Sequence, residues 1–204
     1  MHVIGLTGGI ACGKSAVSHA LREAGACVLD ADRLAHELAA PGGALFQAYA
    51  GHFGSEVLRN DGTLDRRAIG EIVFRNPVER EWVDRISHPI LLDEIKRRLD
   101  NCEKRGHRVA ILDVPLLFEA GWNVLCDEIW VVSVSMEIQL DRLMKRDNLT
   151  AEQAKARVAA QMSLEEKCSR GDVVLDNSGS IDEIGAMAKA LYRNRAALYA
   201  GESP

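Results

Sequence analysis

Short apolar runs recur along the chain, and a turn residue or an acidic residue closes each of them. They cover residues 3–6, 27–29, 109–112, 129–134 and 173–175. Runs of this length that are apolar at nearly every position are typical of strands buried on both faces of a parallel sheet. The pattern therefore predicts five buried strands.

Helical periodicity fills much of the space between these runs. Apolar positions three and four residues apart predict helices over residues 16–24, 90–99, 138–144 and 181–198. Strand alternating with helix is the order of a doubly wound sheet with helices on both faces. The sequence thus predicts a three-layer α/β fold around a five-stranded parallel sheet.

Three helix starts carry the spacing of a capping box. In that motif a Ser or Thr hydroxyl and a Glu or Gln three residues later satisfy each other's free backbone N–H groups. The pairs are Thr150 with Gln153, Ser163 with Glu166, and Ser180 with Glu183. We expect a helix to begin at each pair.

Two long segments interrupt the alternation. Residues 32–107 are helical in pattern, with breaks expected at 41–43, 61–62, 76–77 and 88–89, and are too long for a simple crossover. We interpret them as a helical insertion that holds a second substrate. The charged segment 136–170 is interpreted as a helical lid. The core of this single domain (1–204) then comprises about 1–31, 108–135 and 171–204.

Composition narrows the class of protein. The chain has 25 basic and 30 acidic residues, a net charge of -5, and no basic run, so nucleic acid is not expected as a partner. It has no stretch of eighteen apolar residues, so no membrane span is expected. The five cysteines are scattered without a CxxC pair, which argues against a disulfide framework and favours a reducing cytoplasm.

The strongest chemical signal is the segment GGIACGKS, residues 8–15. It matches GxxxxGK[ST], the P-loop, whose amides wrap phosphates while Lys14 reaches the β and γ oxygens and the Ser15 hydroxyl binds Mg²⁺. An apolar strand enters the loop and a helical pattern leaves it, which places a positive helix terminus at the anion. These flanks disfavour the alternative of a glycine-rich turn without a ligand.

Carboxylates follow two of the predicted strands. Asp30 and Asp32 come directly after the second strand, at the edge of the sheet where the P-loop is expected. They are candidates for a catalytic role; alternatively, one of them caps the next helix and the other is only solvated. Asp113 closes the third run like a Walker B acid that holds a water on Mg²⁺, although turn formation is the plainer role.

Further candidates are two arginines and a histidine. Arg142 and Arg146 share a helix face and could both reach a phosphate, or could instead pair with Asp141 and Asp147. His88 precedes a proline, which favours an extended backbone there. The other histidines show no metal-binding spacing.

These motifs resemble the dephospho-CoA kinase family of P-loop kinases over almost the whole chain. The resemblance rests on IGLTGGIACGKS, DAD at 30–32, DGTLDRRAI from Asp61, ISHP before Ile90, DVPLLFEAGW from Asp113, QLDRLMKRD from Gln139, AAQMS from Ala159 and DNSG from Asp176. It implies the P-loop NTPase fold and transfer of the ATP γ-phosphoryl group, with Mg²⁺, to the 3′-hydroxyl of dephospho-CoA. This is the last step of coenzyme A biosynthesis.

The resemblance also implies roles for residues. Asp32 is implied as the acceptor-side carboxylate, Lys14 as the phosphate lysine and Arg142 as a lid arginine. ATP is expected at Gly9, Ile10, Ala11, Cys12, Gly13, Lys14, Ser15, Ala16, Arg142, Arg146, Asn177, Ser178 and Gly179. Dephospho-CoA is expected near Asp32, Arg66, His88, Pro115, Leu116, Leu117, Phe118 and Glu119. Mg²⁺ is expected on Ser15 directly and on Asp113 through water.

Two positions depart from the family's pattern. Ala11 stands where the loop often carries glycine, and Ala16 where threonine often follows; altered loop flexibility is expected, with the chemistry kept. Cys12 lies in the loop near a helix N-terminus, a setting that favours the thiolate. We expect its oxidation or alkylation to block ATP.

Two alternatives stay open from the residues alone. Another P-loop kinase that acts on a nucleotide or a small alcohol would share nearly every feature. A GTPase switch would need an NKxD segment, which the sequence lacks. The expected assembly is a monomer or a small homo-oligomer.

Overall fold

The computed structural model describes residues 1–200 and divides into two compact units. The first comprises Met1–Leu29 and the chain from Cys102 onward, and the second comprises Asp30–Asn101. The helices and strands follow in this order: β1 (His2–Gly8), α1 (Lys14–Glu23), β2 (Cys27–Asp30), α2 (Ala31–Leu38), α3 (Ala44–Phe53), the 3₁₀ turn η1 (Gly54–Val57), α4 (Arg66–Arg75), α5 (Pro77–Lys104), β3 (Val109–Asp113), the 3₁₀ turn η2 (Trp122–Leu125), β4 (Glu128–Ser133), α6 (Met136–Asp147), α7 (Ala151–Ala159), α8 (Leu164–Arg170), β5 (Val173–Asp176) and α9 (Ile181–Ala200).

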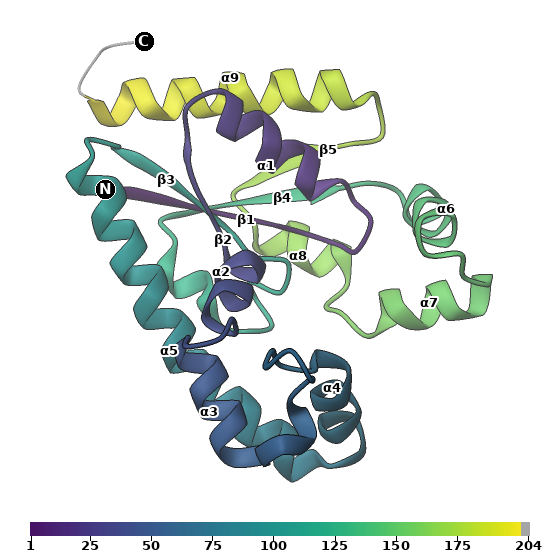
Figure 1. Ribbon diagram of the computed structural model, residues 1–204. Coiled ribbons are helices and arrows are strands. Elements are labelled where there is room, and N and C mark those ends of the chain that lie inside the picture. The colour runs from purple at the N-terminus through teal and green to yellow at the C-terminus, as the bar shows by residue number, and fades with distance from the viewer. Residues whose placement is uncertain (201–204) are drawn as a thin grey trace. The chain divides into compact units, whose positions relative to one another are not determined.

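A five-stranded sheet organises the first unit (Figure 1). Its order is β2-β3-β1-β4-β5, and β1 runs parallel to both of its neighbours, with Leu6 opposite Asp113 and Gly8 opposite Val132. β1 therefore lies at the centre, and the loop that leaves its carboxyl end is flanked by the carboxyl ends of β3 and β4. The five expected strands and the parallel α/β fold are confirmed.

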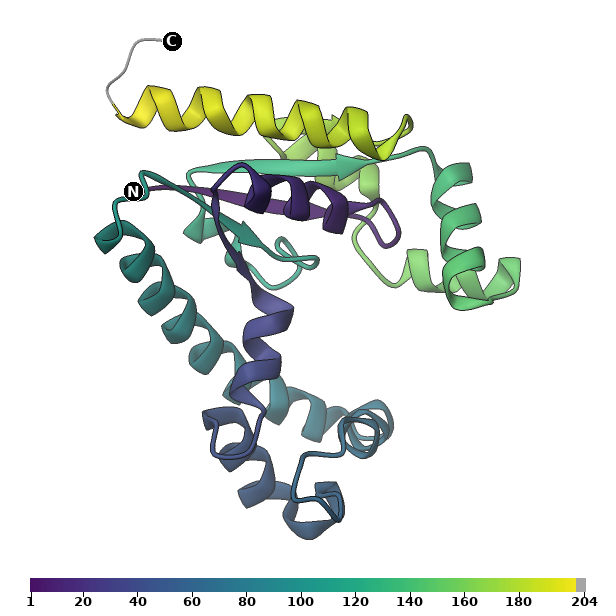
Figure 2. The ribbon, with the colours of Figure 1, turned by 45° about the horizontal axis from the view of Figure 1, so that its top comes forward.

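Helices cover the sheet on both faces. α1 and α9 lie side by side on one face, as Figure 2 shows, and α8 packs against β4. The core between them is built from fully buried side chains such as Ile4, Leu21 and Trp130. All five residues of β3 are buried. Burial on both faces explains why the central strands β1, β3 and β4 show as nearly unbroken apolar runs in the sequence.

The expected capping residues begin their helices. Thr150 and Gln153 form a complete capping box at α7. Ser180 and Glu183 bond reciprocally at α9, at 2.8 and 3.2 Å. Ser163 accepts the N–H of Glu166 at α8. Each bond satisfies an N–H group that the first helical turn leaves free.

The second unit is helical and has its own core. Phe53, Val57, Leu64 and Ile69 form its buried cluster, and Trp82 packs against it. The breaks expected at 41–43 and 61–62 fall between its helices, and the break at 76–77 coincides with the start of α5 at Pro77. The role of this unit in substrate binding, and that of α6 to α8 as a lid, stay predictions.

The expected break at residues 88–89 was wrong. α5 continues through Pro89, so His88 is helical and not extended. A proline inside a helix removes one N–H donor and crowds the preceding turn, but the 28 residues of α5 provide hydrogen bonds on both sides of it. The local rule for residues before proline was overridden by the length of the surrounding helix.

One cysteine pair departs from the sequence expectation. Cys27 at the start of β2 and Cys102 near the end of α5 are paired as a disulfide, with Cα atoms 6.3 Å apart. Cys12, Cys126 and Cys168 are free thiols. The expectation that the cysteines stay unpaired was wrong for Cys27 and Cys102, because strand and helix bring together residues 75 positions apart.

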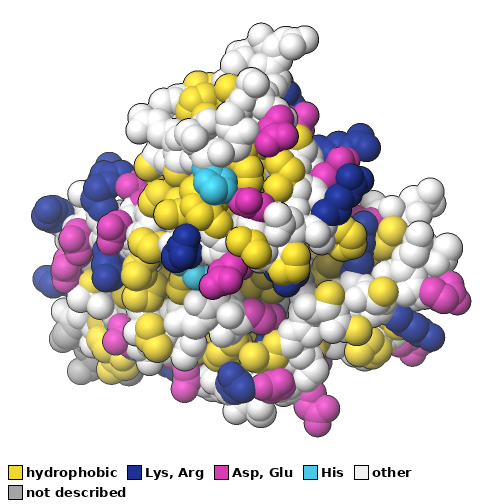
Figure 3. Space-filling model, turned by 90° about the horizontal axis from the view of Figure 1, so that it is seen from below, with side chains coloured by type: hydrophobic (Ala, Val, Ile, Leu, Met, Phe, Trp, Pro, Cys, Tyr) yellow, Lys and Arg dark blue, Asp and Glu magenta, His cyan; other side chains and the backbone are white. Residues whose placement is uncertain are grey.

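Charge is distributed over the surface in both signs. On the face seen in Figure 3, basic and acidic side chains alternate with hydrophobic ones. Several of the exposed charges form helical pairs four residues apart, such as Arg33 with Glu37 and Lys145 with Asp141. Within residues 1–200, every helix is too short or too polar to cross a membrane.

Candidate functional site

The loop of residues 8–15 joins β1 to α1 with a left-handed backbone at Gly13. Gly13 has φ 87° and is the residue before α1. A Cβ there would lie 2.0 Å from Nδ2 of Asn177, so only glycine fits both the conformation and the space. The free N–H groups of the first turn of α1 therefore open toward the loop, as an anion site requires.

Lys14 and Asp113 are brought together at the carboxyl edge of the sheet. The Lys14 ammonium donates to Oδ1 of Asp113, the last residue of β3. Both side chains are largely buried, with 17% and 3% of their surface exposed. The ammonium that the sequence predicts to bind phosphate is thus held by a carboxylate from the neighbouring strand.

Arg142 approaches the same loop from α6. Its guanidinium donates to the Asn177 carbonyl at 3.0 Å, and its Nη1 would lie 3.8 Å from a Cβ on Gly13. The buried Asn177 side chain donates to the Cys12 carbonyl at 2.8 Å. Arg142 and Asn177 therefore lie at the loop, and the Asn177 amide braces the loop backbone.

Two glutamines that the sequence analysis missed bond to the backbone of Ile10 from the segment 136–170. Gln139 of α6 donates to the Ile10 carbonyl at 2.9 Å. Gln161, after α7, accepts the Ile10 N–H at 3.1 Å. Both glutamines lie in quoted segments of the family resemblance, but nothing in their spacing predicts a contact more than a hundred residues away.

Cys12 does not have the reactive setting expected from the sequence. Its side chain is fully buried in the main core, and burial raises its pKa to about 11. Two hydrogen bonds with the backbone of Gly9 and Val134 lower the pKa in part but do not offset burial. The hypothesis of a reactive thiolate was wrong, because the thiol points into the core instead of toward the helix terminus.

The other residues expected at ATP have local contacts of their own. Ser15 is exposed in the first turn of α1, and Ala16 follows it with its N–H on the Gly13 carbonyl. Arg146 bonds to Asp147 at 2.8 and 3.1 Å, in the pairing that the sequence offered as an alternative. The Ser178 hydroxyl donates to the carboxylate of Asp176, the last residue of β5. Gly179 follows Ser178 in the turn before α9.

The segment expected near dephospho-CoA is partly core. Leu117 and Phe118 are buried, whereas Leu116 is 44% exposed. The Pro115 carbonyl accepts from the Thr7 hydroxyl at 3.0 Å. Glu119 accepts the Met162 N–H at 3.1 Å. Leu116 and Glu119 are the exposed residues of this segment.

In the second unit, Asp30 and Asp32 occupy different positions at the start of α2. Asp30 is the N-cap of α2, and its carboxylate accepts the Arg33 N–H at 3.1 Å. Asp32 lies in the first helical turn, two residues beyond the end of β2. The capping role that the sequence left open thus belongs to Asp30.

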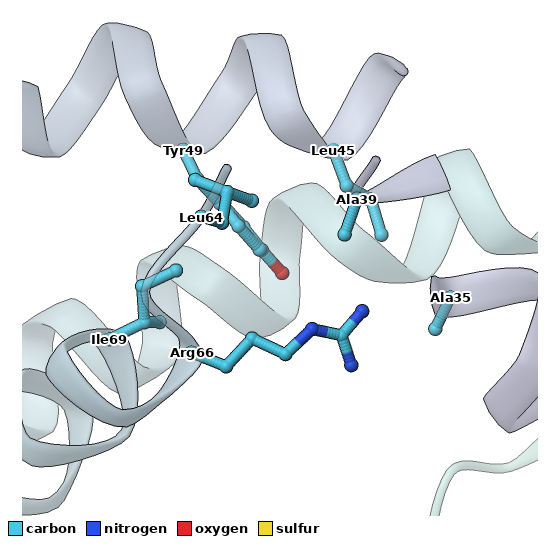
Figure 4. Close-up of a pocket in the computed structure, with 7 residues that line it drawn as sticks. All are labelled: Ala35, Ala39, Leu45, Tyr49, Leu64, Arg66 and Ile69. Atoms are coloured by element: carbon cyan, nitrogen blue, oxygen red, sulfur yellow. The ribbon is translucent and has the colours of Figure 1, made fainter. Parts of the chain in front are cut away.

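Arg66 lines a cavity within the second unit. Figure 4 shows its guanidinium directed into a cavity of about 250 Å³, whose other walls are Ala35, Ala39, Leu45, Tyr49, Leu64 and Ile69. Its Nη1 lies 2.8 Å from Nδ1 of His36. Since a guanidinium only donates, His36 Nδ1 is the acceptor. His88 is exposed on α5, next to Ser87, whose hydroxyl bonds to Tyr49 at 2.6 Å.

The comparison with known proteins decides the family. The sequence model of dephospho-CoA kinase matches residues 2–183. The chain belongs to the dephospho-CoA kinase family. This family carries out ATP-dependent phosphorylation of dephospho-CoA in coenzyme A biosynthesis.

Relatives and solved structures agree. The chain is similar to a dephospho-CoA kinase of Symbiobacterium thermophilum, with 48% identity over 95% of this chain and 81% of that protein. It is similar in structure to TT1252 of Thermus thermophilus, with TM-score 0.80, 33% identity and coverage of 95% and 97%. It is also similar to the dephospho-CoA kinase of Campylobacter jejuni, with TM-score 0.73, 26% identity and coverage of 95% and 96%.

Ala11, where the family's loop often carries glycine, has a strained backbone conformation. Ala11 adopts φ 60°, a left-handed conformation in which a residue with a Cβ is strained by about 1–2 kcal/mol. Glycine adopts it without that strain. The N–H of Ala11 is kept, so the departure changes the loop's energy and not its donors.

The polar groups present fit a magnesium ion that is bound mainly by phosphate. Within residues 1–200 no three His, Cys, Asp or Glu side chains gather to hold a metal. Mg²⁺ usually takes one or two protein ligands and completes its shell with water and substrate phosphates. The exposed Ser15 hydroxyl and the Asp113 carboxylate, held at the loop by Lys14, suit that kind of site.

Proposed function

We propose that this chain transfers the γ-phosphoryl group of ATP to the 3′-hydroxyl of dephospho-CoA. The observation that carries the proposal is the arrangement at Gly13, where Lys14, Asp113 and Arg142 meet the start of α1. Positive groups converge there on a backbone that is shaped for an anion. The family membership supplies the acceptor.

The donor side is proposed to work by alignment and charge neutralisation. Phosphoryl transfer passes through a loose transition state that asks little covalent chemistry of the protein. Lys14 and the loop amides of residues 9–15 bind the β and γ oxygens, and Arg142 neutralises charge on the transferring group. Ser15 and, through water, Asp113 hold Mg²⁺, which supplies further charge neutralisation when it is bound. Arg146 and residues 177–179 are proposed to complete the nucleotide site.

The acceptor side is proposed to depend on Asp32. Asp30 caps α2, and Asp32 lies two residues later in the first turn of that helix, just beyond the end of β2. A carboxylate with a pKa near 4 is a weak base toward an alcohol, so orientation of the 3′-hydroxyl outweighs proton abstraction. The proton is taken late, as the bond to phosphorus forms.

Arg66 is proposed to hold part of dephospho-CoA. A cavity of about 250 Å³ is too small for the whole substrate but accepts one segment of it. Its apolar walls suit an alkyl or ring portion, and a guanidinium suits a phosphate oxygen. His88 and residues 115–119 are proposed as further contacts. Closure of α6 to α8 as a lid would exclude water and limit ATP hydrolysis.

The substitution Asp32→Asn tests the acceptor assignment. We expect it to lower kcat by at least about 100-fold while the affinity for Mg-ATP stays within about threefold, because it removes orientation and not donor contacts. Asp30→Asn is the matched control, since asparagine also caps helices. Near-normal turnover of the Asp32→Asn protein would refute the assignment, and equal losses in both variants would point to the helix instead.

A further inference from the structure

A lysine outside the proposed site is fully buried beside the phosphate-binding loop. Lys167 lies on α8, and its side chain has 0% of its surface exposed. Buried lysines are rare unless their charge is paired and their three N–H groups have acceptors. The groups that surround the buried ammonium of Lys167 therefore decide what it does.

The Lys167 ammonium meets three acceptors, one for each of its N–H groups. It lies 2.9 Å from Oε1 of Glu119 and 3.0 Å from the Pro115 carbonyl. The Gly8 carbonyl is 3.5 Å away, at the long limit of a hydrogen bond. The charge is thus neutralised by one carboxylate and solvated by two backbone carbonyls.

These acceptors lie at the end of β1 and in the segment that follows β3, the two strands that flank the donor site. Gly8 is the last residue of β1, where the phosphate-binding loop begins. Pro115 lies two residues beyond Asp113, the partner of Lys14. Thr7 donates to the same Pro115 carbonyl at 3.0 Å. A single ammonium therefore connects the backbone on either side of the Lys14–Asp113 pair.

We propose that Lys167 is a positioning residue for phosphoryl transfer: its ammonium fixes the ends of β1 and β3 relative to each other and thereby aligns Lys14 with Asp113. The inference rests on the proposed function for the reaction that is aligned. Lys167 itself touches backbone and Glu119, so it acts through these groups and not on the substrate. A misplacement of about 1 Å at a reacting group is enough to slow catalysis by about 100-fold.

The competing explanation is that Lys167 only stabilises the fold. Removing one partner of a buried ion pair destabilises a protein, because it leaves the other charge unpaired. A purely stabilising lysine, however, changes the fraction of folded protein and not the rate constant of the molecules that are folded. The kcat measured well below the unfolding midpoint therefore separates the two explanations.

The experiment compares Lys167→Met with Lys167→Arg and with the control Lys189→Met. Lys189 also forms an ion pair, with Glu23 at 2.7 Å, but on α9 and with 31% of its side chain exposed. We expect Lys167→Met to lower kcat about 10–100-fold with the KM for ATP changed less than about threefold. Lys167→Arg keeps charge and donors and is expected to retain more of kcat, while Lys189→Met leaves kcat unchanged.

A readout that does not depend on turnover accompanies the kinetics. We expect the amide resonances of Gly9 and Gly13 to shift in Lys167→Met and to stay in place in Lys189→Met. Absence of ADP formation by the unmodified protein with dephospho-CoA would refute the proposed function, whereas the amide shifts would still report the alignment. Unchanged loop resonances together with a kcat within twofold would overturn the positioning role.

A second variant keeps the inference testable if Lys167→Met does not fold. Thr7→Val removes the other side-chain donor to the Pro115 carbonyl without leaving a buried charge. We expect it to lower kcat about threefold or more and to shift the same glycine resonances. A folded Thr7→Val protein with normal kcat and normal resonances would count against the alignment of β1 and β3 by these contacts.

Discussion

The side chain of Gln139 donates to the backbone carbonyl of Ile10 at 2.9 Å, across 129 residues of sequence. Gln139 is 2% exposed, and a Cβ on Gly9 would lie 2.5 Å from its Nε2. Together with Gln161 on the N–H of the same residue, it fastens the loop to the segment proposed as the lid. The state of that segment is thus coupled to the backbone that is proposed to bind phosphate.

Removal of either hydrogen bond to the Ile10 backbone is expected to weaken nucleotide binding. Gln139→Ala and Gln161→Ala each delete one hydrogen bond, worth about 1 kcal/mol, so the Kd for Mg-ATP should rise about threefold to tenfold. Titration calorimetry measures it. Lys145→Ala is the control: Lys145 is exposed on α6, the helix of Gln139, and its substitution should leave the Kd unchanged. An affinity within twofold of the original in both glutamine variants would show that the coupling is absent.

The two small residues of the loop are expected to respond in opposite directions. Gly13→Ala places a Cβ at φ 87° and against Asn177, so its free energy of unfolding should fall by about 1–2 kcal/mol or more. Ala11→Gly relieves strain at φ 60°, but glycine also gives the unfolded chain greater freedom, which offsets part of the gain. The free energy of unfolding should therefore rise by less than about 1 kcal/mol. Urea denaturation of both variants checks the pair. A stabilising Gly13→Ala would contradict the loop geometry.

The buried thiols predict a loss of stability in alkali. Burial raises the pKa of Cys12 to about 11 and that of Cys126 to about 12, both above the ordinary value of 9.0. A group whose pKa is higher in the folded chain favours folding below its unfolded pKa, and this preference is lost as pH rises. Stability should therefore fall between about pH 9 and pH 11, and less steeply in Cys12→Ala.

Labelling provides an independent check on Cys12. At neutral pH the folded protein should leave Cys12 unmodified by iodoacetamide, because both burial and the raised pKa suppress the reactive thiolate. The denatured protein, in which the side chain is exposed, is the control. Rapid modification of Cys12 in the folded protein, with protection by ATP, would instead restore the reactive setting that the sequence suggested.

Local patterns in the sequence were enough to predict the frame of this molecule. The strands β1, β3 and β4 are buried at nearly every position, so their apolar runs needed no knowledge of the neighbours. The capping boxes involve residues only three positions apart. The loop from Gly8 to Ser15 is likewise a local motif. Its place between β1 and α1 follows from the order of the elements.

Contacts between distant segments lay beyond such patterns. Gln139, Gln161 and Lys167 each contact the backbone of a residue more than a hundred positions before them. A lone glutamine or lysine carries no pattern that predicts such a contact. The burial of Cys12 depends on which way one side chain turns within the loop. At Pro89 a local rule predicted a break that the long helix α5 overrides.

The most direct test of the central claim is the rate of ADP formation by the purified chain with Mg-ATP, measured with dephospho-CoA and with a panel of nucleoside monophosphates. Lys14→Ala serves as the control, because it removes the ammonium proposed to bind phosphate and should abolish both nucleotide affinity and turnover. The account predicts rapid ADP formation with dephospho-CoA alone, and a product that carries the new phosphate on the 3′-oxygen. Equal rates with the monophosphates, or full activity of the Lys14→Ala protein, would contradict it.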